Sequence, residues 1–455
     1  MNHFFKIFMI VMMASSLLSC ARSDRKTEQS GKTVIHPKWA DNKNIYEVNI
    51  RQYTPEGTFA AFEKHLPRLR EMGVDILWLM PVNPIGELNR KGKLGSYYAV
   101  RDYLAINPEF GTMEEFKALV KKIHAMDMYV LIDWVANHTS WDNDLITNHP
   151  DWYKHDDKGK IIAPVPDWTD VAGLDYTQKG LRDYMTDALK FWVKETDIDG
   201  FRCDVAGMVP TSFWDSARGE LDKIKPVFML AEWESPELHF HAFDMTYGWK
   251  FHHFLNQVAQ GKKPASALDG YFAEIDTLYG KDDYIMNFTS NHDENSWNGT
   301  EYERMKDAAQ VMALLTYTTP GMPLIYSGQE EPLRKRLAFF DKDTIKWKNL
   351  SLAPFYKWLN HMKHENIALW NGSKGGSFIR VKTNADSSMY CFIRERKNNK
   401  IFVITNLSGR QQEATLLGNY HAGDYINLFD NSEVSFSADE PIVVQPWSYL
   451  VLKRN

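Results

Sequence analysis

Two charged residues in one short apolar stretch carry the strongest chemical signal in this sequence. Arg202 and Asp204 lie two positions apart in the run Asp199-Gly-Phe-Arg-Cys-Asp204, and side chains two apart on a β-strand project from the same face. A guanidinium beside a carboxylate lowers the pKa of that carboxyl group. This environment suits an Asp that acts as a nucleophile at neutral pH, so the stretch is a candidate reaction centre.

Three other strand-like segments end in acidic or histidine side chains. They are Asp133-Trp-Val-Ala-Asn-His138, Leu230-Ala-Glu232 and Ser290-Asn-His-Asp293. Acids and histidines are the groups that most often move protons in catalysis. Four such segments in one chain indicate an enzyme site that is assembled from several strands.

The elements that would position these side chains follow a regular alternation. From about residue 44 to residue 326, short apolar runs alternate with longer helical patterns, which is typical of βα units around a parallel sheet. The candidate strands are 45–50, 76–80, 129–132, 200–205, 228–231, 242–245, 284–288 and 323–326. Eight strands favour a closed (β/α)8 TIM barrel, an α/β fold in which catalytic groups lie where strands end and βα loops begin.

Two segments break this alternation. Residues 139–178 are rich in Asp, Asn, Pro and Trp and lack helical periodicity, which predicts a short inserted lobe after the third strand, over the cleft. From about residue 375 the pattern changes to short alternating strands. We therefore expect a catalytic barrel over 38–368, which includes the lobe, and a C-terminal all-β sandwich domain over 369–455.

The first residues predict the compartment. An apolar run over 7–18 follows Lys6, and it is too short for a membrane-spanning helix but typical of a secretory signal. A small residue before Cys20 resembles a bacterial lipoprotein cleavage site, which makes Cys20 the expected lipid anchor; an ordinary signal peptide cut near Cys20 is the alternative. We expect a lipoprotein signal peptide over 1–20, a polar tether over 21–37, and an exported protein anchored at the periplasmic face or the cell surface.

The composition narrows the classes of partner. The formal net charge is −6, and no basic cluster interleaves with aromatic residues, which argues against nucleic acid. Membrane contact is expected only through the N-terminal lipid anchor. The 15 Trp residues suit ring-bearing ligands such as sugars. Cys203 and Cys391 are expected as free core thiols, and the sequence leaves the oligomeric state open.

At these residues the chain resembles the α-amylase family, glycoside hydrolase family 13, over nearly all of its length after the tether. Four segments are similar to the signature regions of the family and occur in its order, which makes the signal specific. They are 133–138, 200–204, the segment around Glu232, and 291–293. Further similar segments are 98–102, 107–112 and 321–330.

The resemblance implies a retaining hydrolase of α-glucosidic bonds, with α-1,4 links in starch-derived glucans or maltooligosaccharides as the expected substrate. It implies that Asp204 is the nucleophile that forms a covalent glycosyl-enzyme and that Glu232 serves as acid and then as base. Asp293 would be the third catalytic acid, which holds sugar hydroxyls of the distorted ring.

The resemblance also implies four substrate-binding residues. Tyr98 would stack beneath the sugar that is cleaved, while His138 and His292 would hydrogen-bond its hydroxyls. Arg202 would keep Asp204 charged. Aromatic side chains on the loops could stack on further glucose units, because aromatic faces pack well on sugar rings; these are Trp141, Trp152, Trp168, Trp249 and Trp297.

The chain departs from the family pattern at two places. Gly207 and Met208 stand where many members carry a Lys-His pair, so contacts on the leaving side must differ. Asn137 matches one ligand of the calcium that many members hold, but Gly173 stands where the family often has a ligating Asp. No cofactor is required by this interpretation, and calcium at Asn137 is left open.

Other activities share the same acids. The family includes α-glucosidases and members that transfer glycosyl groups or isomerise their substrate, and the three acids do not distinguish these from hydrolases that cut within chains. A non-catalytic glucan-binding lipoprotein is the alternative from another class. It is disfavoured because a barrel kept only for binding has no need of the whole set of acids, Arg202 and both histidines.

Overall fold

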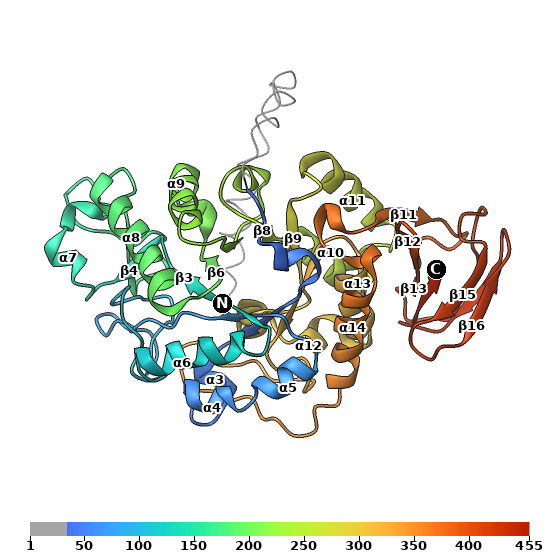
Figure 1. The fold of residues 1–455 in the computed structure, drawn as a ribbon, viewed down its shortest axis with the longest axis horizontal. Coiled ribbons are helices and arrows are strands. Elements are labelled where there is room, and N and C mark those ends of the chain that lie inside the picture. Colours follow the sequence, from blue (N-terminus) through green and yellow to red (C-terminus); the bar gives the residue numbers. More distant parts are fainter. Residues whose placement is uncertain (1–33, 455) are drawn as a thin grey trace, which may run out of the picture.

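The computed structural model describes residues 34–454; residues 1–33 and 455 lie outside the described part. The predicted signal peptide, Cys20 and most of the predicted tether therefore fall outside it. Figure 1 shows two bodies, a barrel surrounded by helices and a β-domain on its flank. Within residues 34–454, no helix is both long and apolar enough to cross a membrane.

Eight parallel strands close into a barrel, as the sequence predicts. They are β1 (Ile45–Val48), β2 (Ile76–Leu79), β3 (Tyr129–Trp134), β6 (Gly200–Cys203), β7 (Phe228–Ala231), β8 (Met245–Tyr247), β9 (Tyr284–Asn287) and β10 (Met322–Tyr326). They follow one another around the ring, and β10 pairs with β1 to close it. The (β/α)8 fold class is confirmed, and all carboxyl ends of the strands meet at one end of the barrel.

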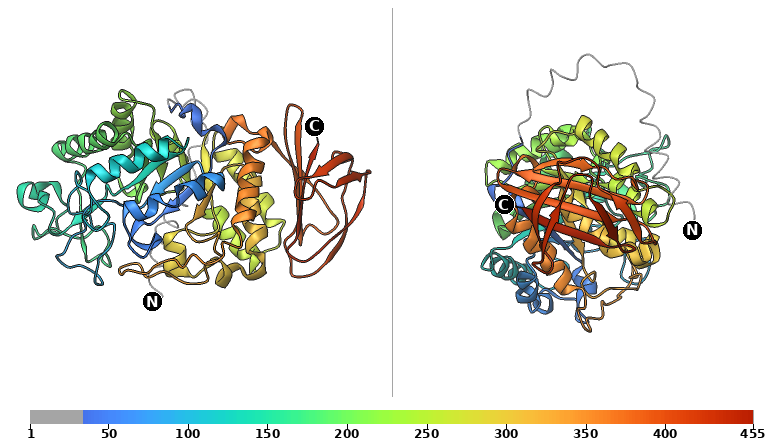
Figure 2. Two further views of the ribbon diagram at one scale, coloured as in Figure 1. Left: turned by 60° about the horizontal axis from the view of Figure 1, so that its bottom comes forward. Right: turned by 90° about the vertical axis from the view of Figure 1, so that its right-hand side faces the viewer.

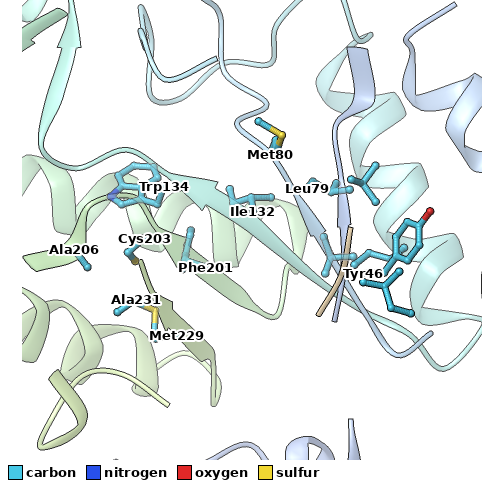
Figure 3. Close-up of a cluster of buried hydrophobic side chains, with 14 of the residues drawn as sticks. Tyr46, Leu79, Met80, Ile132, Trp134, Phe201, Cys203, Ala206, Met229 and Ala231 are labelled. Atoms are coloured by element: carbon cyan, nitrogen blue, oxygen red, sulfur yellow. The ribbon is translucent and has the colours of Figure 1, made fainter. Parts of the chain in front are cut away.

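Side chains alternate between the inside of the barrel and its outer surface. On β3, Leu131 belongs to the inner core, whereas its neighbours Val130 and Ile132 pack outward under the helices. The same alternation places Cys203 in the outer core (Figure 3), while Arg202 and Asp204 face inward. Cys203 and Cys391 are both buried and free, as expected.

The helices that cover the barrel lie in the connections between strands (Figure 1). The longer ones are α6 (Met113–His124), α8 (Lys179–Thr196), α9 (Thr211–Asp222), α10 (Trp249–Ala259), α11 (Ala267–Leu278), α13 (Ala309–Thr318) and α14 (Ala353–Glu365). The shorter ones are α3 (Ile50–Tyr53), α4 (Phe59–Glu63), α5 (Leu66–Glu71) and α12 (Glu301–Met305). The start of α6 is fixed by a capping box, in which Thr112 and Glu115 satisfy each other's backbone N–H groups.

Only β7 has the predicted bounds; the other seven strands differ at one or both ends by one to three residues, and two of these differences have a clear physical cause. The strand predicted over 45–50 ends at Val48, because α3 begins at Ile50. The strand predicted over 242–245 is β8, which begins only at Met245. The apolar residues Ala242 and Phe243 are buried before the strand, so they pack in the core without joining the sheet.

The inserted lobe after β3 is built on a two-stranded antiparallel ribbon. Strand β4 (His138–Ser140) pairs with β5 (Val171–Gly173), and the connection between them carries α7 (Leu145–Asn148) and η4 (Pro150–Trp152). The ribbon therefore fixes the lobe directly at the end of β3, where His138 lies.

The C-terminal domain is all β (Figure 2). A six-stranded sheet has the order β11-β12-β13-β18-β15-β16, and β14 pairs with β17 in a second sheet. The bounds are β11 (Ser377–Val381), β12 (Met389–Arg396), β13 (Asn399–Asn406), β14 (Gln412–Thr415), β15 (Gly423–Asn427), β16 (Glu433–Phe436), β17 (Pro441–Val444) and β18 (Tyr449–Arg454). Apolar residues of both sheets form one buried cluster, which is the packing of a β-sandwich.

The described chain begins at the amino ends of the barrel strands. Nδ1 of His36 lies 2.7 Å from Oδ1 of Asp244, just before β8. Trp39, in η3 (Lys38–Asn42), stacks on Tyr129 at the start of β3 with 4.0 Å between ring centroids. The last residues of the segment predicted as tether are therefore docked against the barrel.

Candidate active site

Arg202 is the centre of a carboxylate cluster at the carboxyl ends of the barrel strands. Its Nη1 donates to Oδ1 of Asp133 at 2.8 Å and to Oδ1 of Asp204 at 3.1 Å. Its Nη2 forms an ion pair with Oε1 of Glu232 at 2.7 Å, and its Nε donates to the hydroxyl of Tyr247 at 3.2 Å. One guanidinium thus contacts three carboxylates from three neighbouring strands.

The backbone holds Asp204 and Glu232 side by side. Glu232 directly follows β7, and its N–H donates to the carbonyl of Cys203 at 3.0 Å, which continues the pairing of the two strands. The N–H of Val205 donates to Oε2 of Glu232 at 2.8 Å. Val205 has φ +36°, a strained conformation for a β-branched residue that costs about 1–3 kcal/mol. In this strained conformation the N–H of Val205 points at the Glu232 carboxylate.

The pKa of Asp204 differs from the sequence-based expectation. Burial and the negative charge of Glu232 raise the pKa of Asp204 well above its usual value, although Arg202 acts in the expected lowering direction. Burial likewise raises the pKa of Asp133 to about 6 against the lowering effect of Arg202. One guanidinium does not offset burial and the neighbouring carboxylates, so the lowered pKa that the sequence predicted for Asp204 is wrong.

His292 and Asp293 complete the opposite side of the cluster. Nε2 of His292 lies 2.8 Å from the hydroxyl of Tyr98 and 3.4 Å from Oδ2 of Asp293. Burial tends to lower the pKa of His292, but the charges of Asp293 and Glu47 outweigh it and raise that pKa to about 9. His292 is therefore charged at neutral pH, and the side chain of Asp293 remains 34% exposed, open to a ligand.

His138 is the neutral counterpart of His292. Burial lowers the pKa of His138 to about 3, so its imidazole can hydrogen-bond a sugar without carrying charge. Its ring lies edge-on to Trp168, with 5.4 Å between the centroids. The structure thus brings Tyr98, His138, Arg202 and His292 to the end of the barrel where Asp204, Glu232 and Asp293 lie.

The surroundings of Asn137 do not fit the calcium that the resemblance leaves open. The Asn137 side chain is buried, and its Nδ2 lies 3.3 Å from Nδ1 of His138. Its backbone carbonyl accepts from the N–H of Leu174, and Gly173 supplies no side-chain oxygen. Within residues 34–454, no group of three or more His, Cys, Asp or Glu side chains could hold a metal ion, whereas calcium prefers six to eight oxygen ligands.

The five tryptophans proposed for sugar stacking differ in their exposure and in their contacts. Trp249 is only 7% exposed and packs in the inner core of the barrel, so it is not available to a ligand. Trp152 stacks on His149 within the lobe, and Trp141 donates to the Thr169 carbonyl there. Trp168 contacts His138, and Trp297 is 44% exposed.

Gly207, at the departure from the family pattern, lies against an indole. A Cβ atom at this position would lie 2.2 Å from Cε2 of Trp233, which follows Glu232 in the chain. The missing side chain therefore makes room for Trp233, and the segment after Asp204 packs on the segment after Glu232.

Several residues of the site lie outside every motif that the sequence analysis used. Glu47 on β1 contacts His292, Trp78 on β2 donates to Oδ2 of Asp133 at 3.2 Å, and Tyr247 on β8 contacts Arg202. Phe339, in the loop after β10, stacks on Tyr98. Only Glu47 gave a signal in the sequence: it is a charged residue inside the buried strand Ile45–Val48, and a buried charge requires a partner.

The chain is similar to known proteins in sequence and in fold. The family model described as the α-amylase catalytic domain matches residues 22–168 and 165–349. The chain belongs to the α-amylase family. Among relatives, α-amylase MalA of Haloarcula japonica is 26% identical over 404 residues, which cover 84% of this chain and 57% of MalA. This member of the α-amylase family thus spans little more than half the length of that relative.

Two solved structures cover nearly the whole molecule. The maltogenic α-amylase AmyB of Thermotoga neapolitana, described as noncanonic, matches with a TM-score of 0.83 and 31% identity, over 91% of this chain and 98% of AmyB. An α-amylase of Lactobacillus plantarum matches with a TM-score of 0.82 and 32% identity, over 92% of this chain and all of that one. The barrel and the β-sandwich are thus shared with α-amylases.

Proposed function

We propose that this α-amylase family member is a retaining glycoside hydrolase that cleaves α-glucosidic bonds, α-1,4 links in starch-derived glucans or maltooligosaccharides. The observation that carries the proposal is the placement of Asp204 and Glu232 on the same guanidinium, that of Arg202. Retaining enzymes hold their two catalytic carboxyl groups about 5 Å apart, whereas inverting enzymes keep them farther apart to leave room for a water molecule. A shared guanidinium supports this close spacing.

In the proposed reaction, a carboxylate oxygen of Asp204 attacks the anomeric carbon while Glu232 protonates the departing glycosidic oxygen. The deprotonated Glu232 then accepts a proton from water, whose oxygen displaces Asp204 and restores the starting configuration. Asp293 would bind hydroxyls of the distorted ring. The acidic surroundings stabilise the positive charge that develops on that ring in both transition states.

The test is NMR of fresh products from maltohexaose, with Asp204→Asn alongside. We expect α-anomers first and at least a 1,000-fold loss in the variant, since a nucleophile is removed. Asp183→Asn, on an exposed ion pair of α8, is the matched control and should leave the rate unchanged. β-Anomers would reject the retaining mechanism. Product lengths separate internal cutting from release of single glucose units and from transfer, and an intact substrate would favour the binding-only alternative.

We also propose export and lipid attachment at Cys20. The support is the sequence alone, the apolar run over 7–18 followed by Cys20, which is typical of lipoprotein signals. Fractionation of bacteria that express the full chain should find it in the membrane, and Cys20→Ala should release it or leave it unprocessed. A soluble wild-type protein that retains residues 1–20 would contradict this proposal.

A further inference from the structure

The segment that carries Asp293 has both of its ends held by one arginine. Arg304, in α12, donates from Nη2 to the carbonyl of Thr289 at 2.7 Å and from Nε to the carbonyl of Gly299 at 2.9 Å. Thr289 precedes the acid and Gly299 follows it in the chain. One guanidinium therefore holds the two ends of residues 289–299 together.

Glu294 follows Asp293 directly and contacts the same arginine. Its side chain is buried. Its Oε2 lies 3.1 Å from Nε2 of His252, on α10, and 3.8 Å from Nε of Arg304. Its Oε1 accepts from Nδ2 of Asn298 at 2.9 Å. This one carboxylate thus links the segment after β9 to two helices, α10 and α12.

His252 is itself fixed by the end of strand β9. Its Nδ1 lies 3.2 Å from the carbonyl oxygen of Phe288, the residue that follows the strand. Its ring stacks on the ring of Phe288, with 4.7 Å between the centroids and an interplanar angle of 11°. Contact with Glu294 therefore ties the position of Asp293 to the end of a barrel strand.

The Glu294 carboxylate keeps its negative charge at neutral pH. Burial alone would raise its pKa, but His252, Arg304 and the hydrogen bond from Asn298 lower that pKa to about 2. Hydrogen bonds to a charged group are shorter and stronger than those between neutral groups. These contacts therefore hold the backbone at Glu294, and with it the adjacent Asp293, more firmly than neutral hydrogen bonds would.

Glu294 also begins a π-helix, η7 (Glu294–Asn298). Helices of this kind are rare and occur often at functional sites. Further along η7, neutral hydrogen bonds hold it to the loop after β10: the N–H of Leu337 donates to Oδ1 of Asn295 at 2.8 Å, and Oγ of Ser296 donates to the carbonyl of Leu337 at 3.0 Å. A change at Glu294 can therefore displace Asp293 while these bonds keep the segment folded.

We infer that Glu294 is a positioning residue for Asp293. This inference rests on the proposed function, in which Asp293 binds hydroxyls of the distorted ring and so contributes most in the transition state. The side chain of Asp293 is 34% exposed, and its carboxylate depends on the backbone for its place. Small displacements of a reacting or binding group are costly in catalysis, so Glu294 should govern kcat more than KM.

The test is a double-mutant cycle of Glu294→Gln and Asp293→Asn, followed through kcat and KM for maltohexaose. Glu294→Gln alone should lower kcat about tenfold and change KM by less than about twofold, because transition-state contacts are lost. In the Asp293→Asn background it should change kcat by less than about twofold, since residues that act through each other are not additive. The control is Glu274→Gln, on an exposed pair with Lys250 of α10, which should leave kcat unchanged.

Binding of acarbose gives a readout that does not need turnover. The unsaturated ring of acarbose imitates a flattened sugar, so calorimetry should show about tenfold weaker binding to Glu294→Gln than to the wild type, and no such difference in the Asp293→Asn background. If the wild type leaves maltohexaose intact but follows this binding pattern, the positioning role stands and only the hydrolase is rejected. If the wild type binds no acarbose, both are rejected.

A purely structural role of Glu294 predicts a different result. Equal losses in the two backgrounds, or an unchanged kcat in Glu294→Gln, would overturn the inference. Circular dichroism and thermal unfolding check the fold of each variant. If Glu294→Gln does not fold, His252→Phe repeats the cycle from the other partner, because it keeps a ring against Phe288 but has no nitrogen to contact the carboxylate.

Discussion

Glu47 and His292, 245 positions apart in the chain, meet inside the barrel, where Oε1 of Glu47 lies 2.5 Å from Nδ1 of His292. Both side chains are almost completely buried. The pair joins β1 to the loop after β9, and it orients the imidazole whose other nitrogen faces Tyr98 and Asp293. Glu47 is therefore a positioning residue for the site.

This pair makes stability depend on pH. Burial alone would lower the pKa of His292, but Asp293 and Glu47 raise it to about 9, above its value of about 6.5 in an unfolded chain. The stabilisation is fully present below pH 6.5 and is lost as the pH rises through 9. Urea unfolding should show a falling free energy across this window, with a weaker fall in Glu47→Gln. An identical pH profile in the variant would exclude the pair as the cause.

Removal of Arg202 should destabilise the fold strongly. Arg202→Met leaves three carboxylates without their cation, and loss of one partner from a buried ion pair costs about 3–5 kcal/mol. The matched control is Arg336→Met, because Arg336 forms an exposed pair with Glu303 that is worth about 0–1 kcal/mol. Urea unfolding of both variants checks this. Equal stability of Arg202→Met and the wild type would show that the cluster is neutralised by other means.

Two glycine substitutions should have opposite effects. Gly207→Ala places a Cβ atom 2.2 Å from the Trp233 indole, and such overpacking costs about 1–3 kcal/mol. Gly219→Ala, within α9, places its Cβ in open space and should stabilise by up to about 1 kcal/mol through helix propensity. The midpoints of urea unfolding measure both. A neutral Gly207→Ala would mean that Trp233 moves aside freely.

Calcium removal should not change the stability. The donors around Asn137 do not form an oxygen cage, so treatment with a chelator is expected to leave the melting temperature within about 1 °C of that in millimolar calcium, since binding to the folded state alone would raise it. Differential scanning calorimetry makes the comparison. A rise of several degrees with calcium would reveal a site that uses other ligands.

The sequence predicts the barrel and the residues at its strand ends because period two and strand-end position follow directly from chain geometry. Arg202 and Asp204 share a face for this reason. Glu47 could be recognised as a buried charge, but its partner is 245 residues away and no local pattern names it. Phe339 lies in a long loop without periodicity, where hydrogen bonds to a distant π-helix determine the position. The pKa of Asp204 depends on burial and on the sum of several charges, which come together only in the folded protein.

His36 and Trp39 fix the described start of the chain to the end of the barrel opposite the carboxylate cluster. A lipid on Cys20, as proposed, would therefore hold the molecule by the base of its barrel. The attachment would then start at the end of the barrel opposite the carboxyl ends of the strands. A chain attached from that end would leave the carboxylate cluster free of the tether, so long glucans could reach it.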